Sequence, residues 1–300
     1  MDNVEQTPDE LLKTADLSFQ NREIEQALVQ YQQAVKVAKE EFNRPVEVES
    51  LAQIARMLLI LGKYEDGRKY LEDAAARAES EDIMGWSRYL GVKGRFEWKA
   101  DQLGPARFTF AEMFEFCTSN ELWSRAIDAA NMMAIVSEDT ASQLQWSKRG
   151  IELAENSGVE SWLGPLWNNL ATSYFDQKNY AEALESFLKA RDYHWRFSPE
   201  TAKLVADYHI GMTYRFLGQY DHARKWLRPV LAWAERLENH SVIAQSLEDL
   251  AECDLAQGYA VRGLDLLQRA REEYELDGTP KHSPALWKAI CARIEKLQNA

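Results

Sequence analysis

Apolar residues along this chain recur every three or four positions, in stripes that short polar turns separate. One stripe carries Trp167, Leu170 and Tyr174, and the next carries Tyr180, Ala183, Phe187 and Ala190. This spacing predicts amphipathic helices, each of which must bury its apolar face against a partner. Helix-breaking segments lie between the stripes, such as DQKN at 176–179, LGQ at 217–219 and AQG at 256–258. The pattern therefore predicts a series of antiparallel helix pairs.

Small residues recur about every 40 positions, which indicates an internal repeat. The first helix of each pair carries Ala15, Ala55, Gly91, Asn131, Ala171, Gly211 and Ala251. Twelve residues later, the second helix carries Ala27, Gly67, Gln143, Ala183, Ala223 and Gly263. Ala106 joins this second column if the third repeat has three extra residues in its turn. Small side chains let two helix axes come close, so we expect tightly packed pairs.

These residues resemble the tetratricopeptide repeat. Repeat five fits the family pattern nearly completely, through Trp167, Leu170, Ala171, Tyr174, Tyr180, Ala183, Phe187 and Ala190, and repeat four departs most. The resemblance implies an all-α, right-handed superhelical solenoid of seven helix pairs that forms a single domain over residues 1–300. Its repeats would begin near residues 8, 48, 84, 124, 164, 204 and 244. A spacing of 40 exceeds the family's usual 34 or so, which implies longer helices.

The segment GTPKHSP at 278–284 interrupts the repeats. After it, Ser283 is expected to cap a final helix over residues 284–298 and Pro284 to open it. The last repeat of a solenoid needs a cover over its apolar side, so this helix is predicted to be a cap. The alternative is a segment that occupies the binding groove.

Composition narrows the function. The formal net charge of −13 argues against nucleic acid and anionic membrane surfaces as partners. The longest aliphatic run, MLLIL at 57–61, is too short for membrane insertion, and the amino terminus does not resemble a signal peptide, so we expect a cytoplasmic protein. The three cysteines and five histidines are dispersed, and no catalytic motif is present. The sequence therefore predicts no enzyme, no cofactor and no metal site.

The family resemblance also implies where a ligand would bind, because the first helix of each tetratricopeptide repeat lines a concave groove. The corresponding stripe is basic in repeats two to four, polar in the middle and acidic at the end. It contains Arg56, Arg88, Arg95, Arg125, Asn168, Thr172, Tyr208, Met212, Arg215, Glu248 and Glu252. Arginine pairs bidentately with carboxylates, so an acidic peptide or a free C-terminus is the expected ligand. The alternative is that the arginines form ion pairs only with neighbouring acids.

The sequence therefore favours a protein-interaction adaptor or scaffold that binds a partner peptide or protein segment in the groove. Two alternatives stay open. The same concavity would serve a small-molecule or signalling-peptide sensor, and exposed end faces would serve a self-assembling structural scaffold, a homo-oligomer. Fold alone does not choose among them.

Overall fold

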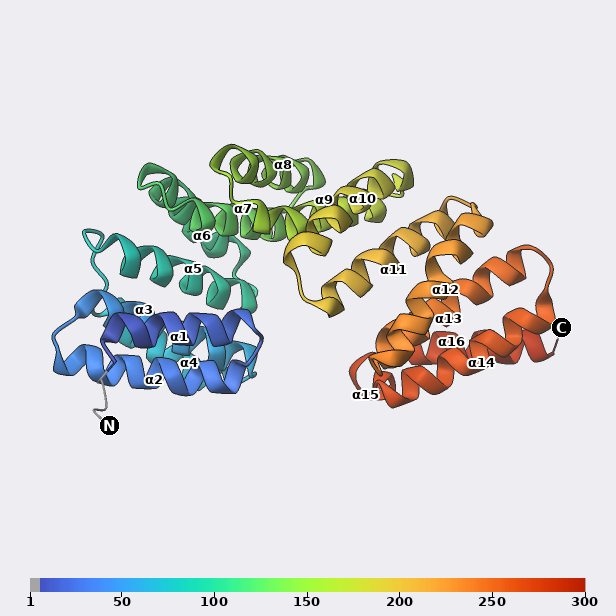
Figure 1. Ribbon diagram of the computed structural model, residues 1–300, viewed down its shortest axis with the longest axis horizontal. Coiled ribbons are helices and arrows are strands. Elements are labelled where there is room, and N and C mark those ends of the chain that lie inside the picture. Colours follow the sequence, from blue (N-terminus) through green and yellow to red (C-terminus); the bar gives the residue numbers. More distant parts are fainter. Residues whose placement is uncertain (1–5, 300) are drawn as a thin grey trace. The chain divides into compact units, whose positions relative to one another are not determined.

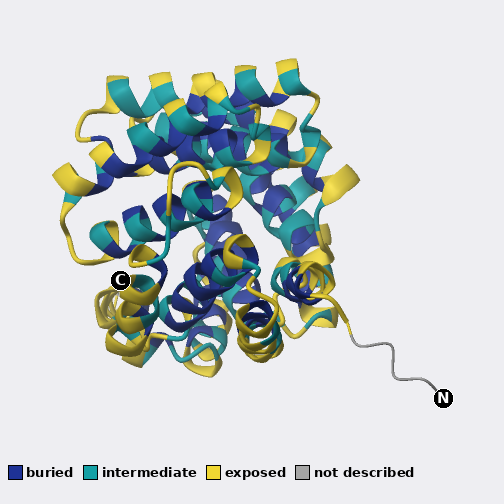
Figure 2. Ribbon diagram, turned by 90° about the vertical axis from the view of Figure 1, so that its left-hand side faces the viewer, coloured by how far each residue is buried: buried dark blue, intermediate teal, exposed yellow. Residues whose placement is uncertain are grey.

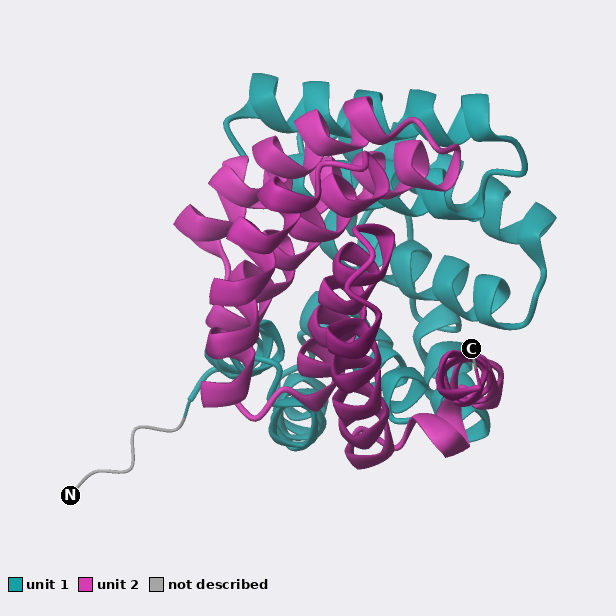
Figure 3. Ribbon diagram, turned by 90° about the vertical axis from the view of Figure 1, so that its right-hand side faces the viewer, with its two compact units in different colours: residues 1–159 teal, residues 160–300 magenta. Residues whose placement is uncertain are grey.

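The computed structural model describes residues 6–299, and within this range the chain folds into sixteen α-helices and no strands (Figure 1). It divides into two compact units, residues 1–159 and 160–300, which Figure 3 distinguishes by colour. Each unit is a stack of antiparallel helix pairs. The prediction of a single domain over the whole chain stays a prediction.

Unit 1 holds four helix pairs. They are α1 (Pro8–Gln20) with α2 (Ile24–Glu40), α3 (Arg44–Ile60) with α4 (Tyr64–Ala75), α5 (Ile83–Lys99) with α6 (Leu103–Ser119), and α7 (Trp123–Val136) with α8 (Thr140–Ser157). The repeats predicted near 8, 84 and 124 begin within one residue of those positions, and the second begins four residues before 48.

Unit 2 holds three pairs and the terminal helices. A short 3-10 turn (Glu160–Trp162) precedes α9 (Leu163–Asp176), which pairs with α10 (Tyr180–Phe197). The next pairs are α11 (Glu200–Phe216) with α12 (Tyr220–Arg236), and α13 (His240–Ala256) with α14 (Ala260–Leu276). The chain then forms α15 (Thr279–His282) and α16 (Pro284–Gln298). Seven pairs and a final helix over 284–298 are therefore observed, as the sequence predicts.

Each 40-residue repeat consists of two nearly equal halves, and each half is one helix with the turn that follows it. Seven of the helices, α2, α3, α5, α6, α11, α12 and α13, contain 17 residues and are followed by a three-residue turn whose middle residue has a positive φ, such as Gly62 (73°), Asp101 (59°) and Gly218 (72°). The next amide then bonds back into the helix, as Lys63 N does to Leu58 O at 2.8 Å. This is the Schellman arrangement, which satisfies carbonyls at the helix end. Seventeen helical and three turn residues give 20, so a pair gives 40.

The two columns of small residues lie where the helices of a pair meet. Their alanines are fully buried, including Ala15, Ala55 and Ala183. A Cβ atom added at Gly211 would lie 2.8 Å from Leu227, which is too close for an unshifted neighbour. The small residues are therefore required by the close packing of each pair.

Repeat three has a different register from the one predicted. A Cβ at Gly94 would lie 2.7 Å from Phe110 of α6, which matches the tight contact that Gly211 makes with the equivalent leucine of α12. Gly94 precedes the buried Ala106 by the usual 12 residues, and the α5–α6 turn has the usual three. The expected insertion and the placement of Gly91 in the first column are therefore wrong.

Repeat four is the least regular pair, as its sequence indicates. Asn131 and Gln143 are only partly buried, in contrast to the alanines and glycines of their columns. Helix α7 has 14 residues, and the turn after it contains no positive-φ residue. The boundary between the two units follows this repeat.

Helix α16 covers the end of repeat seven. Its Ile290 and Ile294 are 2% and 3% exposed and join the apolar core that α13 and α14 share. Ser283 occupies the N-cap position, but its side chain makes no capping hydrogen bond, so that part of the prediction is wrong. The interrupting segment forms the single helical turn of α15. Figure 2 shows buried residues along the faces where helices meet and exposed residues at the turns.

Candidate binding surface

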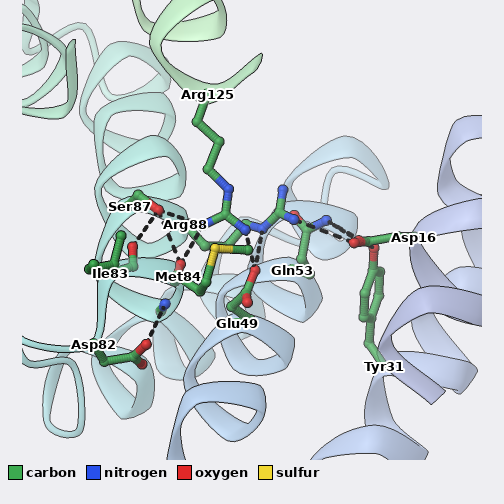
Figure 4. A network of polar contacts seen from close by, with 11 residues as sticks. Asp16, Tyr31, Glu49, Gln53, Asp82, Ile83, Met84, Ser87, Arg88 and Arg125 are labelled. Atoms are coloured by element: carbon green, nitrogen blue, oxygen red, sulfur yellow. Dashed lines mark hydrogen bonds and ion pairs between the residues drawn. The ribbon is translucent and has the colours of Figure 1, made fainter. Parts of the chain in front are cut away.

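The first helices of unit 1 bring two of the predicted arginines, Arg88 and Arg125, into one polar network (Figure 4). Helices α1, α3, α5 and α7 pack in succession. Arg88 of α5 lies between two carboxylates, with Nη2 3.4 Å from Asp16 Oδ2 and Nε 3.3 Å from Glu49 Oε2. Arg125 of α7 places Nη2 2.5 Å from the same Glu49 oxygen. The carboxylate of Glu49 therefore holds two arginines from two other helices.

Neutral side chains complete this network. The Tyr31 hydroxyl donates to Asp16 Oδ1 at 2.5 Å, and Gln53 Nε2 donates to the Tyr31 oxygen at 2.9 Å. Burial and the neighbouring Asp16 raise the pKa of Tyr31 well above its usual range. Tyr31 therefore stays a neutral donor. Arg125 also donates to the Met84 carbonyl and the Ser87 hydroxyl.

Arg95 forms a separate ion pair with a carboxylate of the neighbouring repeat. Its Nη2 lies 2.6 and 2.9 Å from the two oxygens of Asp128, and Nη1 donates to the Gly91 carbonyl at 2.8 Å. Burial acts to raise the pKa of Asp128, but the charges of Arg95 and Arg56 outweigh it and lower that pKa. Asp128 therefore stays ionised.

Arg56 differs from the other three arginines of this face. Among residues 6–299 it forms no ion pair with a carboxylate, and its guanidinium rests on the Phe19 ring at 4.7 Å from the centroid. Burial and the charge of Arg95 lower the pKa of Arg56 to about 9. Four arginines here face three carboxylates, Asp16, Glu49 and Asp128, so the cluster has one positive charge in excess. Asp128 attracts Arg56 from beyond ion-pair distance and is paired directly with Arg95.

The acidic partners of the arginines were not predicted, although their signal lay in the sequence. Glu49 and Asp128 occupy the same helical stripe as the arginines, at positions that face the first helix of a neighbouring repeat. Arg88, Arg95 and Arg125 make internal ion pairs, as the alternative interpretation expects. A role for them toward a ligand stays a prediction.

In unit 2, Asn168 and Thr172 lie on α9. His209 Nδ1 lies 3.0 Å from Asn168 Oδ1, and the Thr172 hydroxyl donates to the Asn168 carbonyl at 3.0 Å. Burial and the neighbouring His194 lower the pKa of His209 to about 4. The imidazole is therefore neutral at pH 7 and donates from Nδ1 to the Asn168 oxygen, which leaves the Asn168 amide group as a donor.

Tyr208 and Arg215 of α11 meet a buried carboxylate of α13. Arg215 Nε lies 2.5 Å from Asp249 Oδ1, and Tyr208, which is 7% exposed, hydrogen-bonds to the same carboxylate. Burial raises the pKa of Asp249 to about 6 although Arg215 opposes the shift. The neighbouring Met212 packs against the apolar core of this unit.

The two predicted glutamates of α13 are also bonded within the chain. Tyr274 donates to Glu248 at 2.7 Å, and Arg293 of α16 donates to Glu252 at 2.6 Å. The acidic end of the predicted stripe therefore contributes to the attachment of α14 and α16. No group of three metal-binding side chains occurs in residues 6–299. Within the same residues no helix has the length and apolar character to cross a membrane.

Comparison with protein families identifies repeats in unit 2. One tetratricopeptide-repeat model matches residues 164–194, and a second matches residues 208–240. The first match coincides with the pair α9–α10, and the second covers the C-terminal part of α11 and the whole of α12. No curated protein matches the chain.

Solved structures with the same fold cover nearly the whole chain. A signal-transduction ATPase from Pyrococcus horikoshii with a tetratricopeptide-repeat sensor matches 98% of it with a TM-score of 0.74 and 17% identity, and the chain spans only 44% of that protein. RapI in its apo form matches 89%, with a TM-score of 0.68, 16% identity and 76% of its own length covered. A Rap protein complexed with Competence and Sporulation Factor matches 97%, with a TM-score of 0.53, 14% identity and 99% of its length covered. Identities this low establish the fold alone.

Proposed function

We propose that this chain, a protein built from tetratricopeptide repeats, binds a partner polypeptide on the first-helix face of unit 1, with Arg56 as the anchor for a carboxylate. The observation that carries the proposal is the unmatched charge of Arg56. The other three arginines of this face form ion pairs with carboxylates of the chain, and Arg56 forms none among the described residues. Asp128, which attracts Arg56 from a longer distance, is already paired with Arg95.

The surroundings of Arg56 favour a carboxylate ligand. A guanidinium presents a planar fork of donors that matches a carboxylate bidentately. Phe19 beneath the guanidinium fixes its plane and supplies an apolar support. Burial of this cation lowers the pKa of Arg56, because the charged guanidinium loses contact with water at a cost to the isolated chain. An acidic side chain or a free C-terminus of the partner would offset that cost.

The test compares Arg56→Gln with the wild-type chain in the binding of a fluorescein-labelled acidic peptide that has a free C-terminus, measured by fluorescence anisotropy. Arg56→Gln should weaken binding about tenfold or more, because one charge-assisted hydrogen bond contributes about 1.5–3 kcal/mol. Arg68→Gln is the matched control, since Arg68 lies on the exposed surface of α4. Equal affinity for the wild type and Arg56→Gln would reject the site.

A second function, as a sensor of a small molecule or a signalling peptide, draws support from two neighbours. One of them is a tetratricopeptide-repeat sensor, and another is a Rap protein in complex with a factor. A sensor should show a rise in melting temperature of several degrees with a metabolite or peptide pool. A pull-down with mass spectrometry, run in parallel with wild type and Arg56→Gln, separates the two functions, because an adaptor should lose a protein partner with the variant.

A further inference from the structure

A pocket in unit 2 lies away from the first-helix stripe, where the second helices α12 and α14 flank α13. Its volume is about 490 Å³. Arg224, Arg228 and Leu231 line it from α12, and Val261, Arg262 and Leu266 line it from α14. Leu250 and Asp254 of α13 lie at its base. A volume of this size lies in the range of ligand-binding pockets.

A buried carboxylate fixes two of the arginines. Asp254 is 2% exposed, and its oxygens lie 2.6 Å from Arg224 Nη2 and 3.0 Å from Arg262 Nη2. Arg224 also donates to Gln257 Oε1 at 2.8 Å. The two guanidiniums share one counter-ion, so they are held in place while only half of their combined charge is neutralised there.

Arg228 provides a third guanidinium, and it has no carboxylate partner among residues 6–299. It is exposed, one helical turn beyond Arg224 on the same face of α12. Asp265 also lines the pocket, so its lining holds three arginines and two carboxylates. A neighbouring hollow shares these three arginines and adds Lys225 and Asp221, whose carboxylate lies 3.4 Å from Arg224. Across both hollows four cations face three carboxylates. This excess of positive charge occurs within a strongly acidic chain.

Apolar side chains adjoin the cations. Leu231, Leu250 and Leu266 contribute to the wall, and Val261 is 85% exposed at the rim. An exposed aliphatic side chain beside guanidiniums suits a ligand that carries an anion and an aliphatic group close together. Burial of such a group on Val261 would remove apolar surface from water.

We propose that this pocket binds an acidic side chain of a partner polypeptide, together with an adjoining aliphatic side chain that covers Val261. Arg228 supplies a guanidinium that has no carboxylate partner in the described chain. Beside it, Arg224 and Arg262, which Asp254 holds in place, supply further positive charge. A carboxylate fits the fork of Arg228, and the aliphatic wall favours a peptide over a fully hydrated anion. This site is independent of the one proposed at Arg56.

The test uses a fluorescein-labelled peptide of alternating leucine and glutamate with an amidated C-terminus, and fluorescence anisotropy reports its binding. Arg228→Glu should weaken binding about tenfold or more, because it replaces an attraction with a repulsion. Arg236→Glu, an exposed position near the end of the same helix and outside the pocket, should change affinity less than about twofold. Arg56→Gln should also leave it within about twofold, which distinguishes this site from the first one.

Three outcomes would overturn the proposal. The first is unchanged affinity in Arg228→Glu. If affinity fell only in Arg56→Gln, the peptide would be assigned to unit 1. The second is equal binding of a peptide with glutamine in place of each glutamate. The third is displacement of the peptide by millimolar inorganic phosphate, which would show that the pocket takes phosphate groups instead. Weaker binding in Arg228→Glu and with the glutamine peptide, without displacement by phosphate, would support it.

Discussion

Glu49→Gln should destabilise unit 1 strongly, because Glu49 is the shared counter-ion of two arginines. Its side chain is 5% exposed, and the side chains of Arg88 and Arg125 are 20% and 14% exposed. Glutamine keeps the shape and removes the charge. Arg125 then keeps only neutral acceptors, namely the Met84 carbonyl, the Ser87 hydroxyl and the amide oxygen of the glutamine, while Arg88 keeps Asp16 at 3.4 Å.

The expected loss is about 3 kcal/mol of unfolding free energy, at the lower end of the range for breaking a buried ion pair. The lower end applies because both arginines retain other acceptors. Exposed pairs contribute far less, so Glu72→Gln is a suitable control: Glu72 is 72% exposed and lies 3.9 Å from Arg68. That variant should change stability by less than about 0.5 kcal/mol.

Urea unfolding followed by far-ultraviolet circular dichroism measures the effect. With a slope of about 2 kcal/mol per molar, Glu49→Gln should lower the midpoint of the affected transition by about 1.5 M. Combining Glu49→Gln with Arg125→Met should cost less than the sum of the single changes, because the second change removes a cation that the first leaves unpaired. A midpoint shift no larger than that of Glu72→Gln would refute the buried network.

Two further predictions concern turns and pH. Glu238 is exposed and has a φ of 51°, so Glu238→Gly should stabilise the chain by about 0.5–1 kcal/mol in urea unfolding. Gly218 has a φ of 72°, so Gly218→Ala should destabilise the chain by about 1 kcal/mol. Equal effects of the two changes would contradict the argument that a side chain is strained at positive φ. The folded pKa of His209, about 4, lies below the unfolded value of about 6.5, so its contribution is present above pH 6.5 and is lost as pH falls toward 4. Between pH 7.5 and 5 this loss should be about 2 kcal/mol, and His209→Gln should remove it; an unaltered pH profile in that variant would count against the assignment.

The helix pairs could be predicted from the sequence because their determinants are local. An apolar stripe such as that of Trp167, Leu170 and Tyr174 specifies a helix through residues that lie within four turns of one another. Two small residues 12 positions apart mark where the two helices of one hairpin pack together. The terminal helix could be placed for the same reason. The register of repeat three was missed because two glycines, Gly91 and Gly94, lie one turn apart, and only the contact with Phe110 distinguishes them.

The ion pairs of the candidate site could be identified only from the tertiary structure. Arg88 and Asp16 are 72 residues apart, and Arg125 and Glu49 are 76 apart, so no local pattern states which arginine meets which acid. The lateral packing of one repeat on another decides it, because an ion pair forms only where two side chains reach within a few ångströms. The sequence by itself determined a stack of long helical hairpins with a basic stripe. The packing of those hairpins placed three arginines of that stripe in ion pairs and left Arg56 without one.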